Sequence, residues 1–229
     1  MVQYPNMREG QFLARPNRFL AHVAIDGREE VCHVKNTGRC RELLQPGARV
    51  WCQHHDDPKR KTAWSLITVE KGERLVNIDS QVPNKLAFDY VQAGGLGFVP
   101  TLVKAEQTYD QSRFDLYYER GDQKGFVEVK GVTLEEDGVA RFPDAPTERG
   151  AKHLQELQKA RAEGYECWIL FVLAMPDIRW LEPNTPRDPQ FAQALWTAAE
   201  HGVQVKAVEC AVYPDGLELT GEVPVHLQP

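Results

Sequence analysis

The stretch SRFDLYYERGDQKGFVEVK, Ser112 to Lys130, decides the fold of the second half of the chain. Its apolar and polar residues alternate around a polar turn, which predicts a β-hairpin. If the turn centres near Asp122, Asp115 lies opposite Glu128 or one step diagonal to it, and Lys130 shares the face of Glu128. In the first strand, the alternation puts Arg113, Asp115 and Tyr117 on one face and Phe114, Leu116 and Tyr118 on the other. Two carboxylates and one ammonium group are therefore expected side by side.

Two carboxylates that face each other across a strand pair repel, and Lys130 offsets this only in part. A divalent cation would neutralise them, and Mg²⁺ is commonly held by one or two carboxylates with water or backbone oxygens. Such an ion activates water for phosphodiester cleavage, and Lys130 can position that water or neutralise the phosphate. The predicted catalytic residues are Asp115, Glu128 and Lys130, and the predicted Mg²⁺ or Mn²⁺ ligands are Glu106, Asp115 and Glu128.

The alternative is an ordinary solvated face. Strand pairs often carry Asp, Glu and Lys on their wet side, and exposed ion pairs contribute almost nothing to stability. The three residues alone favour this alternative, so the catalytic hypothesis needs support from the surrounding sequence.

From about residue 81 the chain predicts, in order, a helix, three strands, a helix, a strand, a helix and a strand. Thr147 and Asp188 are suited to cap the second and third helices, and Gly164 and Gly202 to end them. The segment 126–174 is a strand–helix–strand unit, for which a right-handed parallel crossover is expected. These elements predict a mixed sheet flanked by helices.

The first 80 residues predict about five short strands, with a strong hairpin signal at Asp26-Gly27. That number of strands in that length suggests a small closed barrel of the oligonucleotide-binding (OB) size. The chain is thus an α+β or α/β protein of two domains, with a five-stranded barrel in residues 1–80 and the mixed sheet in residues 81–229.

The 229 residues carry a net charge of −6, but the charge is uneven. Residues 1–80 hold 13 Lys and Arg against 10 Asp and Glu, and the remainder holds 14 against 23. The five cysteines are scattered without a Cys-x-x-Cys pair, which suggests neither a disulfide framework nor a zinc site. No apolar run reaches membrane-spanning length and the N-terminus lacks a secretory pattern, so we expect a cytoplasmic protein with no membrane partner.

Cationic residues cluster around two predicted turns of the barrel. Arg15 and Arg18 flank one turn, and Lys35 and Arg39 flank the other. Clustered cations along a groove are what binding to a phosphate backbone requires. Near the start of the second helix, Arg149 and Lys152 are further candidates, because a helix N-terminus favours phosphate. His153 alone is interpreted as a packing or capping residue.

Several segments together identify a family resemblance: RPNRFLAHV, HVKNTGRCRELLQPGARV, RKTAWSL, SRFDLYYE, VEVKGVTL and FPDAPTERGAKHLQEL. In order, and from about Arg15 to Val208, they resemble the sugar fermentation stimulation protein A family. The resemblance implies an OB-type barrel followed by a restriction-endonuclease-like domain. It also implies sequence-non-specific DNA binding, to single or double strands, and a regulatory role in sugar (maltose) metabolism.

In that nuclease superfamily an Asp precedes an acid-x-Lys motif on the next strand. The resemblance assigns these positions to Asp115, Glu128 and Lys130, with Glu106 as the acid from the preceding segment. Phe114 stands where the superfamily usually has proline, a departure that removes no ligand.

Three functions stay open. The first is a metal-dependent nuclease, the second is a non-catalytic DNA-binding regulator, and the third, more weakly supported, is an enzyme acting on a small phosphorylated or nucleotide ligand. The oligomeric state is open as well, with a dimer as one option.

Overall fold

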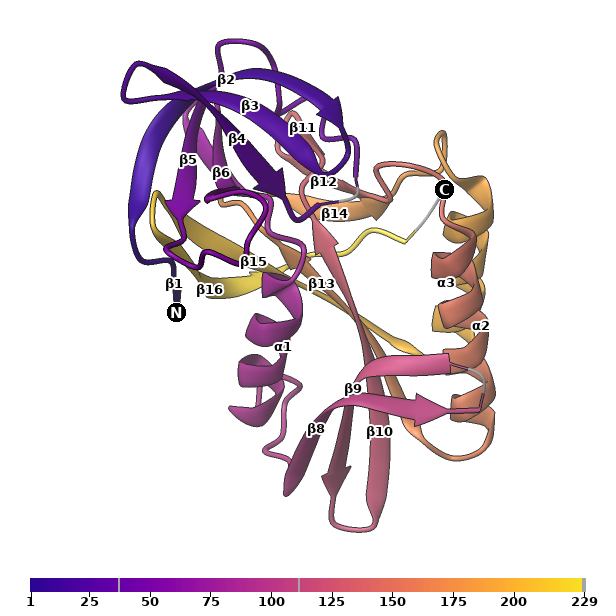
Figure 1. Cartoon of the computed structure of the whole chain (residues 1–229). Coiled ribbons are helices and arrows are strands. Elements are labelled where there is room, and N and C mark those ends of the chain that lie inside the picture. Colours follow the sequence, from indigo (N-terminus) through magenta and orange to yellow (C-terminus); the bar gives the residue numbers. More distant parts are fainter. Residues whose placement is uncertain (37, 111, 228–229) are drawn as a thin grey trace.

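The computed structural model describes residues 1–36, 38–110 and 112–227. A barrel formed by the first third of the chain sits on one end of a larger sheet with helices on both faces (Figure 1). Within the described residues, no helix is long and apolar enough to cross a membrane.

The barrel is formed by five strands, and β7 extends its sheet. The strands follow the order β4-β3-β2-β5-β6-β7, and a parallel pairing of β4 with β6 closes the barrel. Asp26 and Gly27 both have positive φ, as a tight hairpin turn requires. The predicted five-stranded OB barrel is therefore confirmed. The strands are β2 (Met7–Asn17), β3 (Leu20–Ile25), β4 (Arg28–Val34), β5 (Arg49–His54), β6 (Trp64–Lys71) and β7 (Arg74–Asn77).

The second part contains a seven-stranded sheet in the order β1-β16-β15-β13-β10-β9-β8. Strands β10, β13 and β15 are parallel, and the outer strands are antiparallel, which confirms the mixed sheet. The strands are β1 (Val2–Gln3), β8 (Leu102–Tyr109), β9 (Ser112–Arg120), β10 (Gln123–Val132), β13 (Glu166–Leu173), β15 (Gln204–Tyr213) and β16 (Gly216–Val223).

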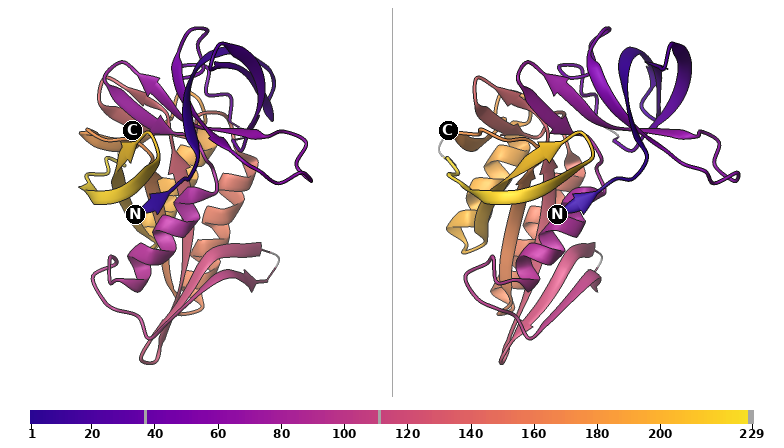
Figure 2. Two further views of the ribbon diagram at one scale, coloured as in Figure 1. Left: turned by 60° about the vertical axis from the view of Figure 1, so that its left-hand side comes forward. Right: turned by 90° about the vertical axis from the view of Figure 1, so that its left-hand side faces the viewer.

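Helices cover both faces of this sheet (Figures 1 and 2). Helix α1 (Val82–Gln92) packs on one face, and α2 (Glu148–Ala162) and α3 (Pro189–Glu200) pack on the other. The predicted caps are confirmed, because Thr147 Oγ1 accepts from Gly150 N and Asp188 Oδ1 accepts from Phe191 N. Asp188 Oδ2 also accepts from Thr147 N at 2.8 Å, which ties the beginnings of α2 and α3 together.

Some elements escape sequence prediction because they are very short or lack a clear pattern. A small sheet of β11 (Glu135–Glu136), β12 (Val139–Phe142) and β14 (Trp180–Pro183) lies beside the barrel. The N-terminal strand β1 pairs with β16, so the first residues of the chain join the sheet of the second domain.

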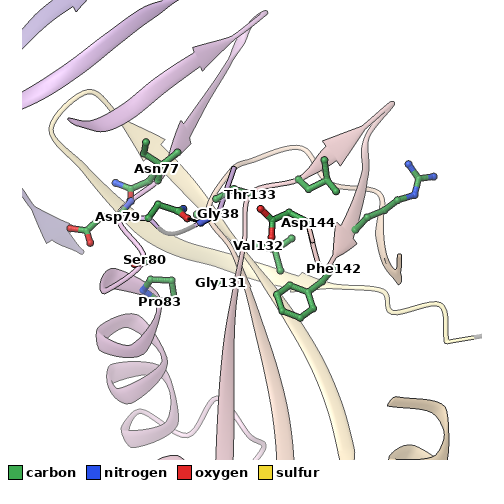
Figure 3. A pocket seen from close by; sticks show the side chains of 15 residues that line it. Gly38, Asn77, Asp79, Ser80, Pro83, Gly131, Val132, Thr133, Phe142 and Asp144 are labelled. Atoms are coloured by element: carbon green, nitrogen blue, oxygen red, sulfur yellow. Dashed lines mark hydrogen bonds between the residues drawn. The ribbon is translucent and has the colours of Figure 1, made fainter. Parts of the chain in front are cut away.

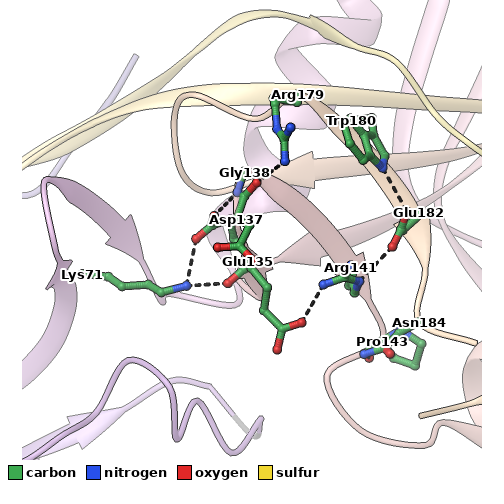
Figure 4. A network of polar contacts seen from close by, with 11 residues as sticks. Lys71, Glu135, Asp137, Gly138, Arg141, Pro143, Arg179, Trp180, Glu182 and Asn184 are labelled. Carbon is green, nitrogen blue, oxygen red and sulfur yellow. Dashed lines mark hydrogen bonds and ion pairs between the residues drawn. The ribbon is translucent and has the colours of Figure 1, made fainter. Parts of the chain in front are cut away.

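Barrel and sheet share one apolar core and several polar links. The backbone N–H of Asn77 donates to Ala174 O at 2.9 Å. Figure 4 shows the buried carboxylate of Glu135 at this junction, where it accepts from Lys71 at 2.8 Å and pairs with Arg74 at 2.7 Å. The barrel is thereby held in a defined position against the end of β10 that carries the candidate site.

Candidate functional site

The candidate site lies where β9 and β10 diverge. Their backbone pairing runs from Gln123↔Arg120 to Val127↔Leu116 and stops one position before Asp115 and Glu128 would pair. Beyond that point, the Asp115 carboxylate accepts from the backbone N–H of Val129 at 2.8 Å. We call the group Asp115, Glu128, Lys130 and His153 the β9–β10 fork.

The prediction that Phe114, Leu116 and Tyr118 share one face is wrong. Leu116 and Tyr118 pack in the core beneath α1, whereas Phe114 packs in the core beneath α2, with its ring centroid 5.0 Å from that of Phe126. The regular alternation fails because β9 leaves β10 at Asp115, whose side chain replaces the next backbone pairing.

Asp115 is held from both neighbouring elements. Its Oδ1 atom accepts from Asn84 Nδ2 of α1 at 2.9 Å, while Oδ2 accepts from β10. Burial raises the pKa of Asp115, and the negative charge of Glu128 raises it further. The charge of Glu128 therefore opposes the ionisation of Asp115.

Glu128 is almost fully buried, with 2% of its surface exposed. Its Oε1 atom accepts from Lys130 Nζ at 2.6 Å and from His153 Nδ1. Burial raises the pKa of Glu128, but the hydrogen bond from His153 and the charge of Lys130 outweigh it, so the pKa lies below its ordinary value. Its Oε2 atom is buried and has no hydrogen-bond partner among the described residues.

His153 reaches this site from the second turn of α2. Arg149 Nε donates to His153 Nε2 at 3.3 Å, so Nε2 is the acceptor and Nδ1 carries the proton given to Glu128. Sequence reasoning assigned His153 only a packing or capping role and missed this contact. No local pattern in the sequence signals this contact, because it depends on how α2 packs on the sheet.

Glu106 is not brought to the two carboxylates. It has a positive φ in β8, and its exposed side chain pairs with Arg113 at 3.4 Å. Across the described ranges, no group of three or more His, Cys, Asp or Glu residues could hold a metal ion. A cation with two protein carboxylates still fits the fork, because Glu128 Oε2 is a buried oxygen in need of a partner.

The predicted phosphate-binding residues of the barrel divide into two kinds. Arg15 is built into the structure: its guanidinium donates to the carbonyls of four residues at 2.7–2.9 Å, namely Arg18, Asn36, Gly38 and Arg39. Lys35 is also engaged, because its Nζ pairs with the buried Asp79 carboxylate at 2.9 Å. By contrast, Arg18 and Arg39 are exposed.

The two candidates on α2 are more accessible. Arg149 is exposed apart from its contact with His153, and Lys152 is exposed, with a weak ion pair to Glu156 at 3.7 Å. Thus Arg18, Arg39, Arg149 and Lys152 keep donors for an external anion, whereas the two terminal nitrogens of Arg15 and the ammonium group of Lys35 are engaged internally.

The fold and site define a two-domain protein that joins an OB barrel to a mixed-sheet domain with a buried carboxylate–lysine site. The chain belongs to the sugar fermentation stimulation protein family. The profile "SfsA N-terminal OB domain" matches residues 13–78, and "Sugar fermentation stimulation protein RE domain" matches residues 81–216.

Similar proteins cover nearly the whole chain. The sugar fermentation stimulation protein homologue of Desulfitobacterium hafniense (strain Y51) is 54% identical over 99% of both chains. The homologue of Clostridium beijerinckii is 50% identical over 99% of this chain and all of its own. The solved structure of Pyrococcus furiosus SfsA in complex with Ca²⁺ aligns with a TM-score of 0.88 at 29% identity, covering 98% of each chain.

Proposed function

We propose that this protein binds DNA and cleaves phosphodiester bonds at the β9–β10 fork with the help of a divalent cation. The observation that carries the proposal is the Glu128 carboxylate. One of its oxygens accepts from both Lys130 and His153, while the other is buried without a hydrogen-bond partner among the described residues. An unpartnered buried carboxylate oxygen is unfavourable unless a cation or a donor reaches it.

Mg²⁺ or Mn²⁺ would be held by Asp115 and Glu128. Once bound, the cation would stabilise negative charge on a phosphoryl oxygen and acidify the attacking water. His153 fixes the orientation of Glu128, and the Lys130 ammonium provides a positive charge beside the scissile phosphate. The solved relative from Pyrococcus furiosus, which was crystallised with Ca²⁺, supports a divalent cation in this family.

The nucleic-acid assignment rests on the barrel and on the position of free cations. An OB barrel suits a strand of nucleic acid, and Arg18 and Arg39 are exposed on its loops. Arg149 and Lys152 are exposed at the start of α2, where the helix N-terminus favours phosphate. Glu128 is linked to the same helix through His153, so a bound backbone would pass close to the fork.

The second candidate is a non-catalytic DNA-binding regulator of sugar metabolism. It is favoured by one observation: Glu106 is turned away, so the described residues provide only two carboxylates at the fork. In this second candidate function, the fork binds a cation and DNA but does not cleave the DNA.

A cleavage assay separates the two candidates. The purified protein is incubated with single-stranded DNA, duplex DNA and RNA in Mg²⁺ or Mn²⁺, together with Asp115→Ala, Lys130→Ala and the control Lys124→Ala. Lys124 is an exposed lysine on the same strand, ahead of the buried stretch that carries the fork. We expect the wild type and Lys124→Ala to cleave, and the two fork variants to lose about 100-fold or more in rate. If the wild type binds DNA but cleaves none of these substrates, the non-catalytic DNA-binding regulator is supported instead.

A further inference from the structure

A cavity of about 180 Å³ lies between the two domains, at the end of β10 (Figure 3). Its walls come from the end of the barrel, the start of α1, the end of β10 and the segment after β12. One wall contains Gly131, which directly follows Lys130, so the cavity begins one residue beyond the fork. The volume is far more than the roughly 10–15 Å³ that one water needs. Polar residues of its walls include Asn77, Asp79, Ser80, Thr133 and Asp144.

The cavity is unsuited to a phosphate, because Arg141, the only cationic residue that lines it among the described residues, is already paired, and the neighbouring Lys35 is paired with the lining residue Asp79. Lys35 Nζ lies 2.9 Å from the Asp79 carboxylate. The Arg141 guanidinium pairs with Glu182 at 2.8 Å and with Glu136. A phosphate entering the cavity would therefore find no free positive charge to replace its hydration.

Two polar groups of the cavity wall remain without partners. The half-buried Asp144 carboxylate points toward Gly38 (Figure 3) and lies against it, and within the described ranges its side chain makes no hydrogen bond or ion pair. Asn77 is 1% exposed, and its Nδ2 atom has no hydrogen-bond partner among the residues that the structure describes. Among the described residues, the wall thus offers an acceptor in Asp144 and a donor in Asn77, and leaving the buried Asn77 amide without a partner is costly.

A nucleobase edge carries the complementary groups. Carboxylates accept from exocyclic amino groups of bases, and side-chain amides bind base edges. The hydroxyl groups of Ser80 and Thr133 add contacts that can donate or accept. The Phe142 ring and Pro83 supply apolar surface for the face of the base.

A neighbouring cleft carries exposed arginines, which the cavity lacks. This cleft, of about 490 Å³, shares Leu134 and Asp144 with the cavity. It is lined by Arg39, Arg41 and Arg187 and also by the acidic residues Glu42 and Glu136. All three arginines are exposed. A nucleotide whose base occupies the cavity could therefore place its phosphate group against these arginines.

We propose that this cavity receives the base of one unpaired nucleotide next to the cleavage site. The inference rests on the proposed function, because it concerns a strand that the protein binds. The base must be unpaired, since both domains close around a space too small for a duplex and a stacked base has to leave its helix to enter it. The cavity would thereby direct the protein to bulges, mismatches and single-stranded ends.

The test compares two labelled duplexes that differ only in one bulged nucleotide. Binding is followed by fluorescence anisotropy in EDTA, so that neither cation binding nor cleavage contributes. We expect the wild type to prefer the bulged duplex by about tenfold, the value of one good base contact. Thr133→Phe fills the cavity, and Asp144→Asn removes the acceptor charge without adding bulk. Both should reduce the preference below about threefold, while the control Lys124→Ala, at an exposed residue outside the cavity, keeps it.

The outcomes are distinguishable. If the wild type binds both duplexes equally, or if Thr133→Phe and Asp144→Asn keep the full preference, the base cavity is refuted while DNA binding stands. Failure of the wild type to bind any DNA refutes the proposed function and the cavity with it.

A competition arm uses deoxynucleoside monophosphates. Displacement of the bulged duplex only at concentrations far above the duplex Kd supports the cavity as part of a strand-binding site. Displacement at concentrations near that Kd would assign the cavity to free nucleotides and overturn the proposal.

Discussion

The β9–β10 fork and the barrel loops around Arg15 both gather charged residues, yet they use them differently. At the fork, four donors converge on two carboxylates and still leave Glu128 Oε2 without a partner among the described residues. In the barrel loops, the two terminal nitrogens of Arg15 donate to four backbone carbonyls, and its buried Nε atom has no hydrogen-bond partner among the described residues. A charged side chain is available for function only when its neighbours leave some of its bonding capacity unused, and the residue type alone does not reveal this.

The largest effect is expected from Arg15→Ala. The substitution removes four charge-assisted hydrogen bonds that join the Arg18 turn to the 36–39 loop. We expect the free energy of unfolding in urea to fall by about 3 kcal/mol, because hydrogen bonds to charged groups contribute about 1.5–3 kcal/mol each and the carbonyls are only partly buried. The exposed Arg18→Ala should change it by less than about 0.5 kcal/mol. If the two substitutions lower the free energy of unfolding equally, the distinction between hydrogen-bonded and free arginines is wrong.

A comparison of two buried glutamates gives the next prediction. Both oxygens of Glu135 are partnered, by Lys71, Arg74 and the Gly138 N–H, and its pKa is lowered to about 2 although burial opposes this. Because the folded-state pKa is below the ordinary 4.5, the stabilisation is complete above about pH 4.5 and is lost as pH falls toward 2. Glu135→Gln should lose about 2–3 kcal/mol at neutral pH and flatten the acid limb of a pH–stability profile. An unchanged acid limb in that variant would contradict the assignment.

A smaller effect is expected at His153, which acts on the cation through Glu128. His153→Ala removes one of the two donors on Oε1 and leaves the carboxylate free to turn. We expect Mn²⁺ affinity in isothermal titration to fall about tenfold, the usual effect of losing a residue that orients a ligand. His153→Asn retains a donor near the Nδ1 position and should recover most of the affinity. If Asn and Ala behave alike, His153 has no orienting role.

The smallest effect is expected at Arg39. This residue is exposed and lines the 490 Å³ cleft together with Arg41 and Arg187. Arg39→Ala should weaken duplex binding similarly across sequences and reduce the slope of log Kd against log salt by about one unit. The same measurement on Lys35→Ala serves as the contrast, because Lys35 is paired with Asp79. A larger loss of slope in Lys35→Ala than in Arg39→Ala would reverse the expected order.

The fold was largely predictable because its signals are local. The Asp26-Gly27 turn, the Thr147 and Asp188 caps and the apolar run of β13 each follow from a few neighbouring residues. The two-residue strand β1 could not be predicted, since its only support is a pairing with β16 more than 200 residues away.

The site was predictable only in part. Strand alternation placed Glu128 and Lys130 together, because both lie on the regular stretch of β10. It failed at Phe114 because β9 leaves β10 there. Glu106, which the family resemblance assigned as the acid of the preceding segment, is exposed and paired with Arg113 instead. The role of His153 depends on how α2 packs on the sheet, which no local pattern encodes.

The most direct test of the account is a titration of Mn²⁺ into the wild type and Glu128→Gln, with Glu135→Gln as a second buried-glutamate control. We predict one site per chain in the wild type and in Glu135→Gln, and loss of that site in Glu128→Gln. A wild type that binds no cation, or a Glu128→Gln variant that binds it as well as the wild type, would contradict the account.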